Sequence, residues 1–348
     1  MNKKKKKYTY ISIMQIISAL LILLLHSNPD NVSSVVMSKG WYRIFYFILY
    51  QIRVDHIALV VFMGISGMLC TLSSTNLWER KSYLEYVKRR ALRLLLPYIV
   101  INILLYLPKA LLNDYMQADT QLSVKFFLNM ITNPRSGVSA NLWFLPTLFW
   151  LSVMSPILQK IAKYEKLWVR YTFMALFVLI HCLPDVTNTL ALNDVKKYLM
   201  FYYLGMLINK QIIDFSYTQI RYILLLLGCG LIGFVITLYF HDNLFVDTIY
   251  LCFGGIVVFT LSLLLERFFY ENKEPYLGDK TMSIYLLSFP VTTAIDIIFG
   301  VLGINTIITV ICMFLFGLCI PVIIHILFNR FCEKIGRKLP VLAAIIGG

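Results

Sequence analysis

Apolar runs recur along the whole of this 348-residue chain, and they constrain its fold more than any other feature. The runs 11–25 and 304–328 are long and almost unbroken. A helix needs about 20 predominantly apolar residues to cross a bilayer, whereas a strand of a transmembrane barrel needs roughly ten alternating ones. The runs therefore predict an all-α protein, a polytopic transmembrane helical bundle.

The composition excludes an ordinary soluble domain. Hydrophobic residues make up 59% of the chain and charged residues only 14%, against about 25% charged residues in soluble domains. The net charge of +14 would suggest nucleic acid in a soluble chain, but here it predicts basic cytoplasmic loops and membrane lipids as partners. The seven cysteines are scattered and form no CxxC pair, so neither a metal site nor a disulfide framework is expected.

About ten segments are apolar enough to be predicted as spans of one membrane domain, residues 1–348. The aromatic segment 41–52 is instead expected to lie in the membrane interface. The predicted spans are 10–26, 54–72, 94–112, 142–161, 167–183, 198–208, 222–240, 248–265, 283–300 and 304–328.

Loop charges predict the orientation of these spans. With the N-terminus inside, 24 of the 32 Lys and Arg residues lie on the cytoplasmic side. This excess is typical of cytoplasmic loops, and an odd number of spans would spoil it. Both termini are therefore predicted to be cytoplasmic, as a short basic segment 1–9 and a tail 329–348.

Ionisable side chains beside the predicted spans are candidates for function, because charge is costly at membrane depth. His26 ends the first span, where an imidazole suits a general base; an interfacial hydrogen bond is the alternative. Arg53, Asp55 and His56 open the second span from the same side. Asp55 either orients His56 or pairs with Arg53 at the helix start, and both interpretations remain open.

Three arginines in the segment 83–98 form a candidate anion site. Arg90 and Arg93 are three residues apart and so share a helical face, and Arg89 flanks them. The guanidinium fork matches phosphate oxygens, so a cytoplasmic phosphorylated donor such as coenzyme A would dock here. Anchoring to anionic lipid is the alternative interpretation.

Several motifs, in order across residues 10–295, resemble the acyltransferase 3 family of integral membrane acyltransferases. The first span ends in His26, and the second carries a motif similar to FFxxSGxxL. The next element is very like kRxxRLxxPY, and a later one looks like lGxxSxxIYLxHxP. The segments that carry the resemblance read MQIISALLILLLHSN, VFMGISGMLC, KRRALRLLLPY, NLWFLPTLFW, FYYLGMLI and LGDKTMSIYLLSFP.

This chain departs from the family pattern at three positions. Gln15 stands eleven residues before His26, where members often carry Arg, and Ser288 stands where the IYL element commonly ends in His. Gln15 can hydrogen-bond to an anion but cannot neutralise it. His56 stands where many members carry Pro, and it is a candidate to replace the lost imidazole.

The resemblance implies acyl transfer from cytoplasmic acetyl-CoA, or another acyl-CoA, without a metal. The implied acceptor is a hydroxyl of a surface polysaccharide, or of its lipid-linked precursor, outside the cell membrane of a bacterium. His26 would be the general base or acyl carrier, with His56 and Asp55 as further catalytic candidates. Arg90 and Arg93 would hold CoA phosphates. The other substrate-binding candidates are Arg89, Gln15, Ser66, Trp143, Phe144, Tyr285 and Ser288.

Two other classes of function remain open from the sequence. A transporter or flippase of a small molecule or lipid-linked sugar suits about ten spans equally. The RRALR element together with His26 favours the acyltransferase. Gln15 and Ser288 also leave room for an acyltransferase-like sensor without chemistry.

Overall fold

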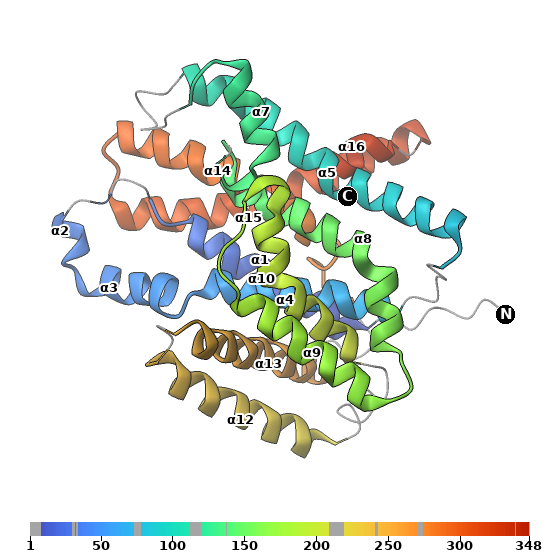
Figure 1. The fold of residues 1–348 in the computed structure, drawn as a ribbon. Coiled ribbons are helices and arrows are strands. Elements are labelled where there is room, and N and C mark those ends of the chain that lie inside the picture. Colours follow the sequence, from blue (N-terminus) through green and yellow to red (C-terminus); the bar gives the residue numbers. More distant parts are fainter. Residues whose placement is uncertain are drawn as a thin grey trace.

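Helices form every regular element in the part of the chain that the structure describes, as the apolar runs predict. The structure is a computed structural model (Figure 1). The predicted N-terminal segment 1–9 lies outside the described residues except for its last two. The described residues are 8–29, 32, 34–72, 78–111, 120–136, 138–208, 219–240, 243–269, 274–337 and 339–347.

The long helices follow the predicted spans closely. They are α1 (Thr9–His26), α4 (Val54–Leu72), α5 (Arg80–Leu111), α8 (Phe144–Ala162), α9 (Leu167–Cys182), α10 (Leu192–Leu207), α12 (Ile220–Leu238), α13 (Leu244–Phe269), α14 (Thr281–Val301) and α15 (Thr306–Ile335). The shorter elements are α2 (Ser34–Met37), α3 (Gly40–Tyr46), the π-helix η1 (Phe47–Gln51), α7 (Val124–Thr132), η2 (Pro134–Ser136), η3 (Ala140–Trp143), η4 (Thr189–Ala191) and α16 (Pro340–Ile345).

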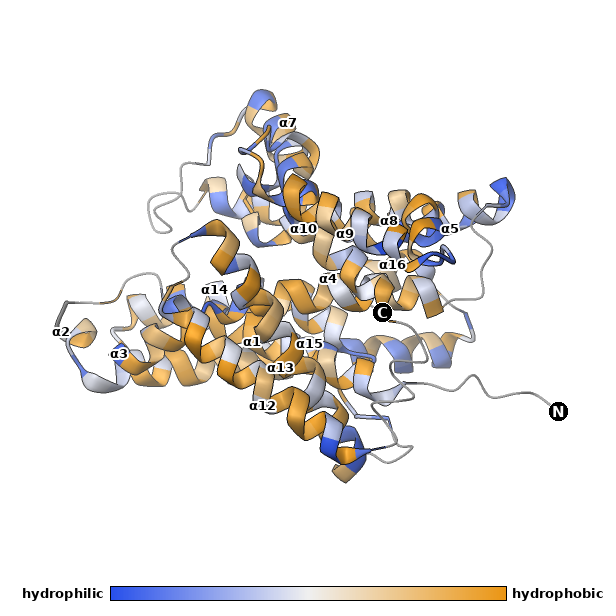
Figure 2. Ribbon diagram, turned by 60° about the horizontal axis from the view of Figure 1, so that its bottom comes forward, coloured by the Kyte–Doolittle hydropathy of each residue, from blue (hydrophilic) through white to orange (hydrophobic). Residues whose placement is uncertain are grey.

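Eight helical segments of the described chain are long and apolar enough to cross a membrane, so the chain is a multi-pass membrane protein. One of them joins α3, η1 and α4. Helices α9 and α10 have 16 residues each and are shorter than a typical span, so the number of spans stays a prediction. Figure 2 shows hydrophobic residues along most of the bundle and hydrophilic ones at α7 and at the free ends of α5 and α12.

Some helices continue beyond the apolar run that defines the predicted span. Helix α5 starts at Arg80 rather than Leu94, and α10 starts at Leu192 rather than Tyr198. Helix α15 runs seven residues past Phe328, and α16 follows it, so much of the predicted tail 329–348 is helical. These extensions contain polar residues, and their backbone continues the hydrogen bonding of the helix beyond the apolar run.

Contacts between helix termini define two ends of the bundle. At one end, the first turn of α1 donates a backbone hydrogen bond to Glu266 near the end of α13 (3.1 Å). At the other end, Arg53 pairs with Asp247 near the start of α13. His26 closes α1 at this second end, which we call the His26 end. The first end is called the Arg90 end, and α16 packs there against α5.

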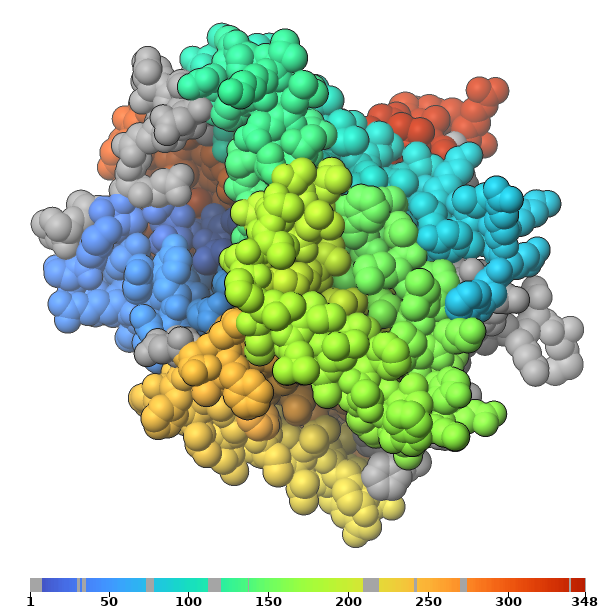
Figure 3. Space-filling model, viewed as in Figure 1, coloured from blue at the N-terminus to red at the C-terminus, as the bar shows by residue number. Residues whose placement is uncertain are grey.

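Helices α4 and α10 approach each other so closely that only glycine fits at the points of contact. A Cβ atom on Gly67 would lie 1.9 Å from the Tyr202 carbonyl oxygen, and one on Gly205 would lie 1.9 Å from the Gly64 oxygen. Only glycine permits such backbone contact, which is a common way of joining membrane helices. The space-filling view shows α8, α9 and α10, in green to yellow-green, side by side on the face toward the viewer (Figure 3).

Replacing Gly67 with alanine is expected to destabilise the bundle by roughly 1–3 kcal/mol, because the new methyl group meets backbone that cannot rotate away. The measurement is the thermal unfolding midpoint of the purified protein in detergent. Gly228→Ala is the matched control, since nothing lies within 4 Å of a Cβ atom at this position of α12. Equal midpoints for Gly67→Ala and Gly228→Ala would contradict the close contact.

Candidate functional site

His26 lies at the last residue of α1, against α14. Its ring centroid is 5.1 Å from that of Phe289, whose other neighbour is the ammonium group of Lys109 at 5.3 Å. Lys109 also donates to the carbonyl of Val138 (2.7 Å). Within the described residues neither ring nitrogen of His26 has a hydrogen-bond partner, so the imidazole is available to a ligand. Neither Phe289 nor Lys109 was singled out in the sequence analysis.

Arg53, His56 and Asp55 form a polar cluster at the same end, in which Arg53 and His56 are hydrogen-bonded and Asp55 lies beside His56. Arg53 Nη2 lies 2.9 Å from His56 Nδ1, and His56 Nε2 lies 3.6 Å from Asp55 Oδ2. A guanidinium only donates, so Nδ1 of the neutral ring accepts and Nε2 carries the proton toward Asp55. Arg53 forms its ion pair with Asp247. Of the two sequence interpretations, the structure therefore shows Asp55 beside His56, with Arg53 paired elsewhere.

The backbone of Arg53 is held in an unusual conformation. Its φ angle of 50° lies in the left-handed region, which costs energy for a residue other than glycine. The hydroxyl of Tyr250 donates to the carbonyl of Ile52 (2.7 Å) and braces this turn. Asp247 and Tyr250 share the first two turns of α13, so this helix fixes the cluster from outside α4. Sequence reasoning found neither residue, because nothing local links them to Arg53.

Aromatic rings form a wall in the bundle interior. The Phe144 ring lies 5.6 Å from Tyr285, 5.8 Å from Phe62 and 6.4 Å from Trp143. Arg135 stacks on Trp143 with 4.0 Å between the guanidinium carbon and the ring centroid. The structure thus brings three predicted substrate-binding residues, 143, 144 and 285, into one cluster.

Buried hydroxyl and amide groups beside this wall lack hydrogen-bond partners within the described residues. Tyr285 is not among them, because its hydroxyl donates to the carbonyl of Asn141 (2.9 Å). The side-chain oxygens of Ser18, Ser139, Asn141 and Ser288 are all buried without a partner. A buried polar group without a partner costs roughly 1–3 kcal/mol, so these oxygens suit contact with water or a ligand. Ser288, unlike Tyr285, therefore has a free donor.

Gln15 and Ser66 are half-buried and have no hydrogen bond within the described chain. Gln15 lies eleven residues, or three helical turns, before His26 and so shares its face of α1. Ser66 precedes Gly67 in the segment of α4 that contacts α10. Among the described residues the structure adds no side-chain partner that would assign either residue a role.

The three predicted anion-binding arginines lie at the opposite end from His26. Arg90 stacks over Tyr86 (5.3 Å) and acts electrostatically on Cys70, near the end of α4. Arg93 lies close enough to be repelled by Arg90, and both Arg89 and Arg93 are exposed. Lys109 follows Arg90 by 19 residues on α5, which is about 28 Å of helix. The imidazole and the arginines are therefore separated along the bundle axis.

Two cavities open at the Arg90 end, where the termini of α1, α4, α8, α9 and α10 meet. The larger has a volume of about 490 Å³ and carries the cations Lys163 and Arg170 beside Tyr8 and Thr71. The neighbouring cavity of about 390 Å³ shares Lys163 and adds Lys160 and Lys166, together with Tyr164 and Glu165. In the sequence analysis these cations counted only as charges of cytoplasmic loops. The cavity that they line is formed by the ends of five helices, and no local sequence pattern reveals it.

A buried polar cluster joins α14 and α15 at the same end. Ser283 Oγ lies 2.8 Å from His325 Nδ1, and His325 Nε2 lies 3.9 Å from Asp279. Partial burial alone would raise the pKa of Asp279, but the ammonium of Lys280 at 2.7 Å outweighs it and lowers the pKa below its usual value. Asp279 is therefore ionised at neutral pH. The side chain of His325 is buried.

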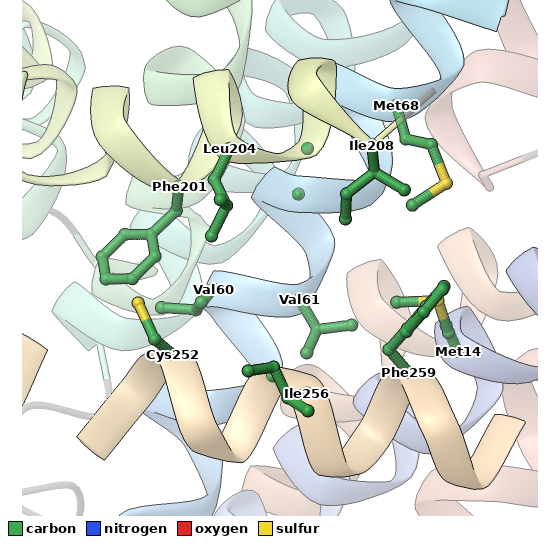
Figure 4. Close-up of a pocket in the computed structure, with 13 residues that line it drawn as sticks. Met14, Val60, Val61, Met68, Phe201, Leu204, Ile208, Cys252, Ile256 and Phe259 are labelled. Carbon is green, nitrogen blue, oxygen red and sulfur yellow. The ribbon is translucent and has the colours of Figure 1, made fainter. Parts of the chain in front are cut away.

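A third space is wholly apolar and differs from the polar regions described above. It is a slot of about 90 Å³, with α10 on one side, α13 on the other and α4 at the back (Figure 4). Phe201, Cys252, Ile256 and Phe259 are among its lining residues. The slot offers no polar side chain to a thioester or a sugar, so it takes no part in the site proposed below.

No group of three or more His, Cys, Asp or Glu side chains suited to a metal ion occurs among the described residues. The sites described above offer an imidazole, hydroxyls and cations. This combination suits proton transfer from a hydroxyl at one end and anion binding at the other.

Comparison with known families yields one match: the family model described as "Acyltransferase domain", of acyltransferase 3, matches residues 8–326. This range covers all the helices from α1 to most of α15. No curated protein and no solved structure matches the chain.

The Arg53–Asp247 pair is expected to stabilise the His26 end. In a double-mutant cycle of Arg53→Ala and Asp247→Ala, the coupling free energy should lie within roughly 0.5–3 kcal/mol, because the two charges are partly withdrawn from water. The cycle is measured by thermal unfolding. The exposed pair Lys197–Asp185 is the control and should couple by less than about 1 kcal/mol. A coupling free energy near zero for Arg53 and Asp247 would contradict a structural role.

Proposed function

The chain belongs to the acyltransferase 3 family and is a membrane acyltransferase, and we propose that it transfers an acetyl group from cytoplasmic acetyl-CoA to an extracytoplasmic glycan. The proposed acceptor is a hydroxyl of a surface polysaccharide or of its lipid-linked precursor. The proposed location is the cytoplasmic membrane of a bacterium, with the His26 end outside. One observation carries the proposal: an unpartnered imidazole and a cationic cavity occupy opposite ends of the same bundle.

At the His26 end, the imidazole is the proposed general base. A ring nitrogen of His26 takes the proton of the acceptor hydroxyl while the hydroxyl oxygen attacks the acetyl carbon. The new C–O bond forms, the C–S bond of the thioester breaks, and the departing thiolate of CoA takes up a proton. His56 is a weaker candidate for this base, because its Nδ1 already accepts from Arg53. Asp55 and Arg53 would instead hold His56 in position.

Between the two ends, the aromatic wall and the free hydroxyls are proposed to line the path of the thioester arm. Trp143, Phe144 and Tyr285 offer flat apolar surface to the arm. Ser288 Oγ has no hydrogen-bond partner among the described residues and is proposed to donate to the thioester oxygen. Tyr285 is less suited to that donation, since its proton is already given to Asn141.

At the Arg90 end, the CoA phosphates are proposed to bind the cavity cations together with the arginines of α5. Lys163 and Arg170 supply two positive charges inside the larger cavity. Arg90 lies at the same end, beside Cys70, which directly precedes the cavity residue Thr71. A nucleotide with several phosphates needs more than one cation, and Arg90 on α5, Arg170 on α9 and Lys163 just after α8 offer three. Gln15 would contribute a hydrogen bond but no charge.

Substitution His26→Ala is expected to lower acetyl transfer at least 100-fold, because a positioned general base contributes roughly 10²–10⁴ in rate. The protein is reconstituted in proteoliposomes, and transfer from labelled acetyl-CoA to glycan is measured. CoA binding should stay unchanged, since His26 lies at the other end. His56→Gln is the matched control and should retain most of the activity. Full activity of His26→Ala would remove His26 from the mechanism.

The double variant Lys163→Ala/Arg170→Ala is expected to weaken CoA binding about 10-fold or more, because each charge-assisted contact contributes roughly 1.5–3 kcal/mol. Binding is measured by calorimetry on protein in nanodiscs of neutral lipid. Arg90→Ala should weaken binding similarly. Lys334→Ala, in the last turn of α15, is the control for a general loss of positive charge. Equal affinities in all variants would leave only anchoring to anionic lipid.

A further inference from the structure

An aromatic ladder projects from the His26 end on α3 and η1. Tyr42, Tyr46 and Tyr50 recur every four residues and so share one helical face. The ring centroids of Tyr42 and Tyr46 are 6.4 Å apart, and those of Tyr46 and Tyr50 are 4.5 Å apart. Tyr46 and Tyr50 are 47% and 41% exposed, whereas Tyr42 is buried. Figure 3 shows this segment, in blue, along one edge of the molecule.

The ladder is tied directly to the chain that follows His26. The side-chain amide of Asn28 donates to the Tyr50 hydroxyl (3.1 Å), and the Tyr42 hydroxyl donates to Asn28 Oδ1 (3.1 Å). Asn28 is two residues after His26, so these bonds fix the rings relative to the imidazole. They also leave the hydroxyl proton of Tyr50 free to donate.

The backbone beneath the ladder has two rare features. Residues Phe47–Gln51 form a π-helix, a conformation that occurs mainly at functional sites, and the strained Arg53 follows it. Helix α4 alone has 19 residues and is long enough, at about 28 Å, to cross the hydrocarbon core. Since α4 alone is long enough for the span, we place the ladder beyond its His26 end, on the side where an acceptor would arrive.

We propose that Tyr46 and Tyr50, braced by Asn28, form a carbohydrate-binding platform that presents a sugar hydroxyl to His26. This inference rests on the proposed function and assigns the acceptor its site. The C–H bonds on one face of a pyranose carry partial positive charge and pack against the negative face of an aromatic ring. The free proton of Tyr50 donates to a ring substituent. Anchoring in the lipid interface would explain the exposed rings, but it would not require the hydrogen bonds of Asn28 with Tyr42 and Tyr50.

The experiment measures binding of fluorescent pyranose oligosaccharides, two to six hexose or N-acetylhexosamine rings long, to the full-length protein in nanodiscs. The parent protein is expected to bind members of this panel. Tyr46→Ala and Tyr50→Ala should each weaken that binding about 10-fold or more. Tyr50→Phe, which keeps the ring and loses only the hydroxyl, should weaken it less than Tyr50→Ala. Trp168→Ala removes a 66% exposed aromatic ring at the Arg90 end and should change nothing.

Three results would overturn the platform: no binding of any oligosaccharide by the parent, equal binding by the parent and both alanine variants, or equal losses for Trp168→Ala. If Tyr50→Ala fails to fold, Tyr46→Ala still tests the platform. Acetyl transfer separates the two proposals. If the parent protein acetylates glycan and Tyr46→Ala leaves the KM for the acceptor unchanged, the proposed function stands and the platform is overturned. If the parent protein binds sugar through the ladder but transfers no acetyl group, the platform stands and the proposed function is overturned.

Discussion

The backbone contact between α4 and α10 determines where the chemical groups of this protein lie. Gly64, Gly67 and Gly205 let the backbones of the two helices touch in the second half of α4 and near the end of α10, which fixes the helices against each other. Helix α4 carries the Arg53–His56 cluster at one end, Phe62 in the middle and the cavity residue Thr71 at the other end. Helix α10 likewise runs from Asp194, which binds Arg135, to residues of the same cavity. Both ends of the proposed reaction path are therefore built on one rigid pair.

The apolar bilayer explains why the polar groups separate into two clusters. Charges are tolerated where water or a partner reaches them, and they are costly at mid-membrane. Arg53 and Arg135 are both paired with aspartates at the His26 end, while Arg90, Lys163 and Arg170 lie at the other. The residues described between the two ends are aromatic rings and hydroxyls, which carry no charge. Such a lining suits a thioester, which is polar but neutral, better than it suits an ion.

Sequence alone predicted the helical architecture well, because an apolar run of span length has few other solutions in a membrane. It also singled out His26, Arg90 and the aromatic residues 143, 144 and 285, through motifs that lie within one helix or helix end. It missed Asp247, Lys163 and Arg170, whose importance comes from contacts between segments far apart in the chain. Asp247 lies 194 residues from its partner Arg53. No local pattern encodes such a contact, and the same limit hid the cavity at the Arg90 end.

Two buried hydroxyls without a partner among the described residues lie on the adjacent helices α1 and α14. Helices α1 and α14 run side by side, since Ser12 meets Gly278 at one level and both Leu23 and Thr292 meet Gly317 at another. Ser18 and Ser288 lie between these levels, and each has a buried oxygen without a partner. Serine elsewhere in the bundle, such as Ser152, satisfies its hydroxyl on the preceding helical turn. Two unsatisfied hydroxyls on adjacent helices, on the way from the Arg90 end to His26, are better explained by a transient polar ligand than by packing alone.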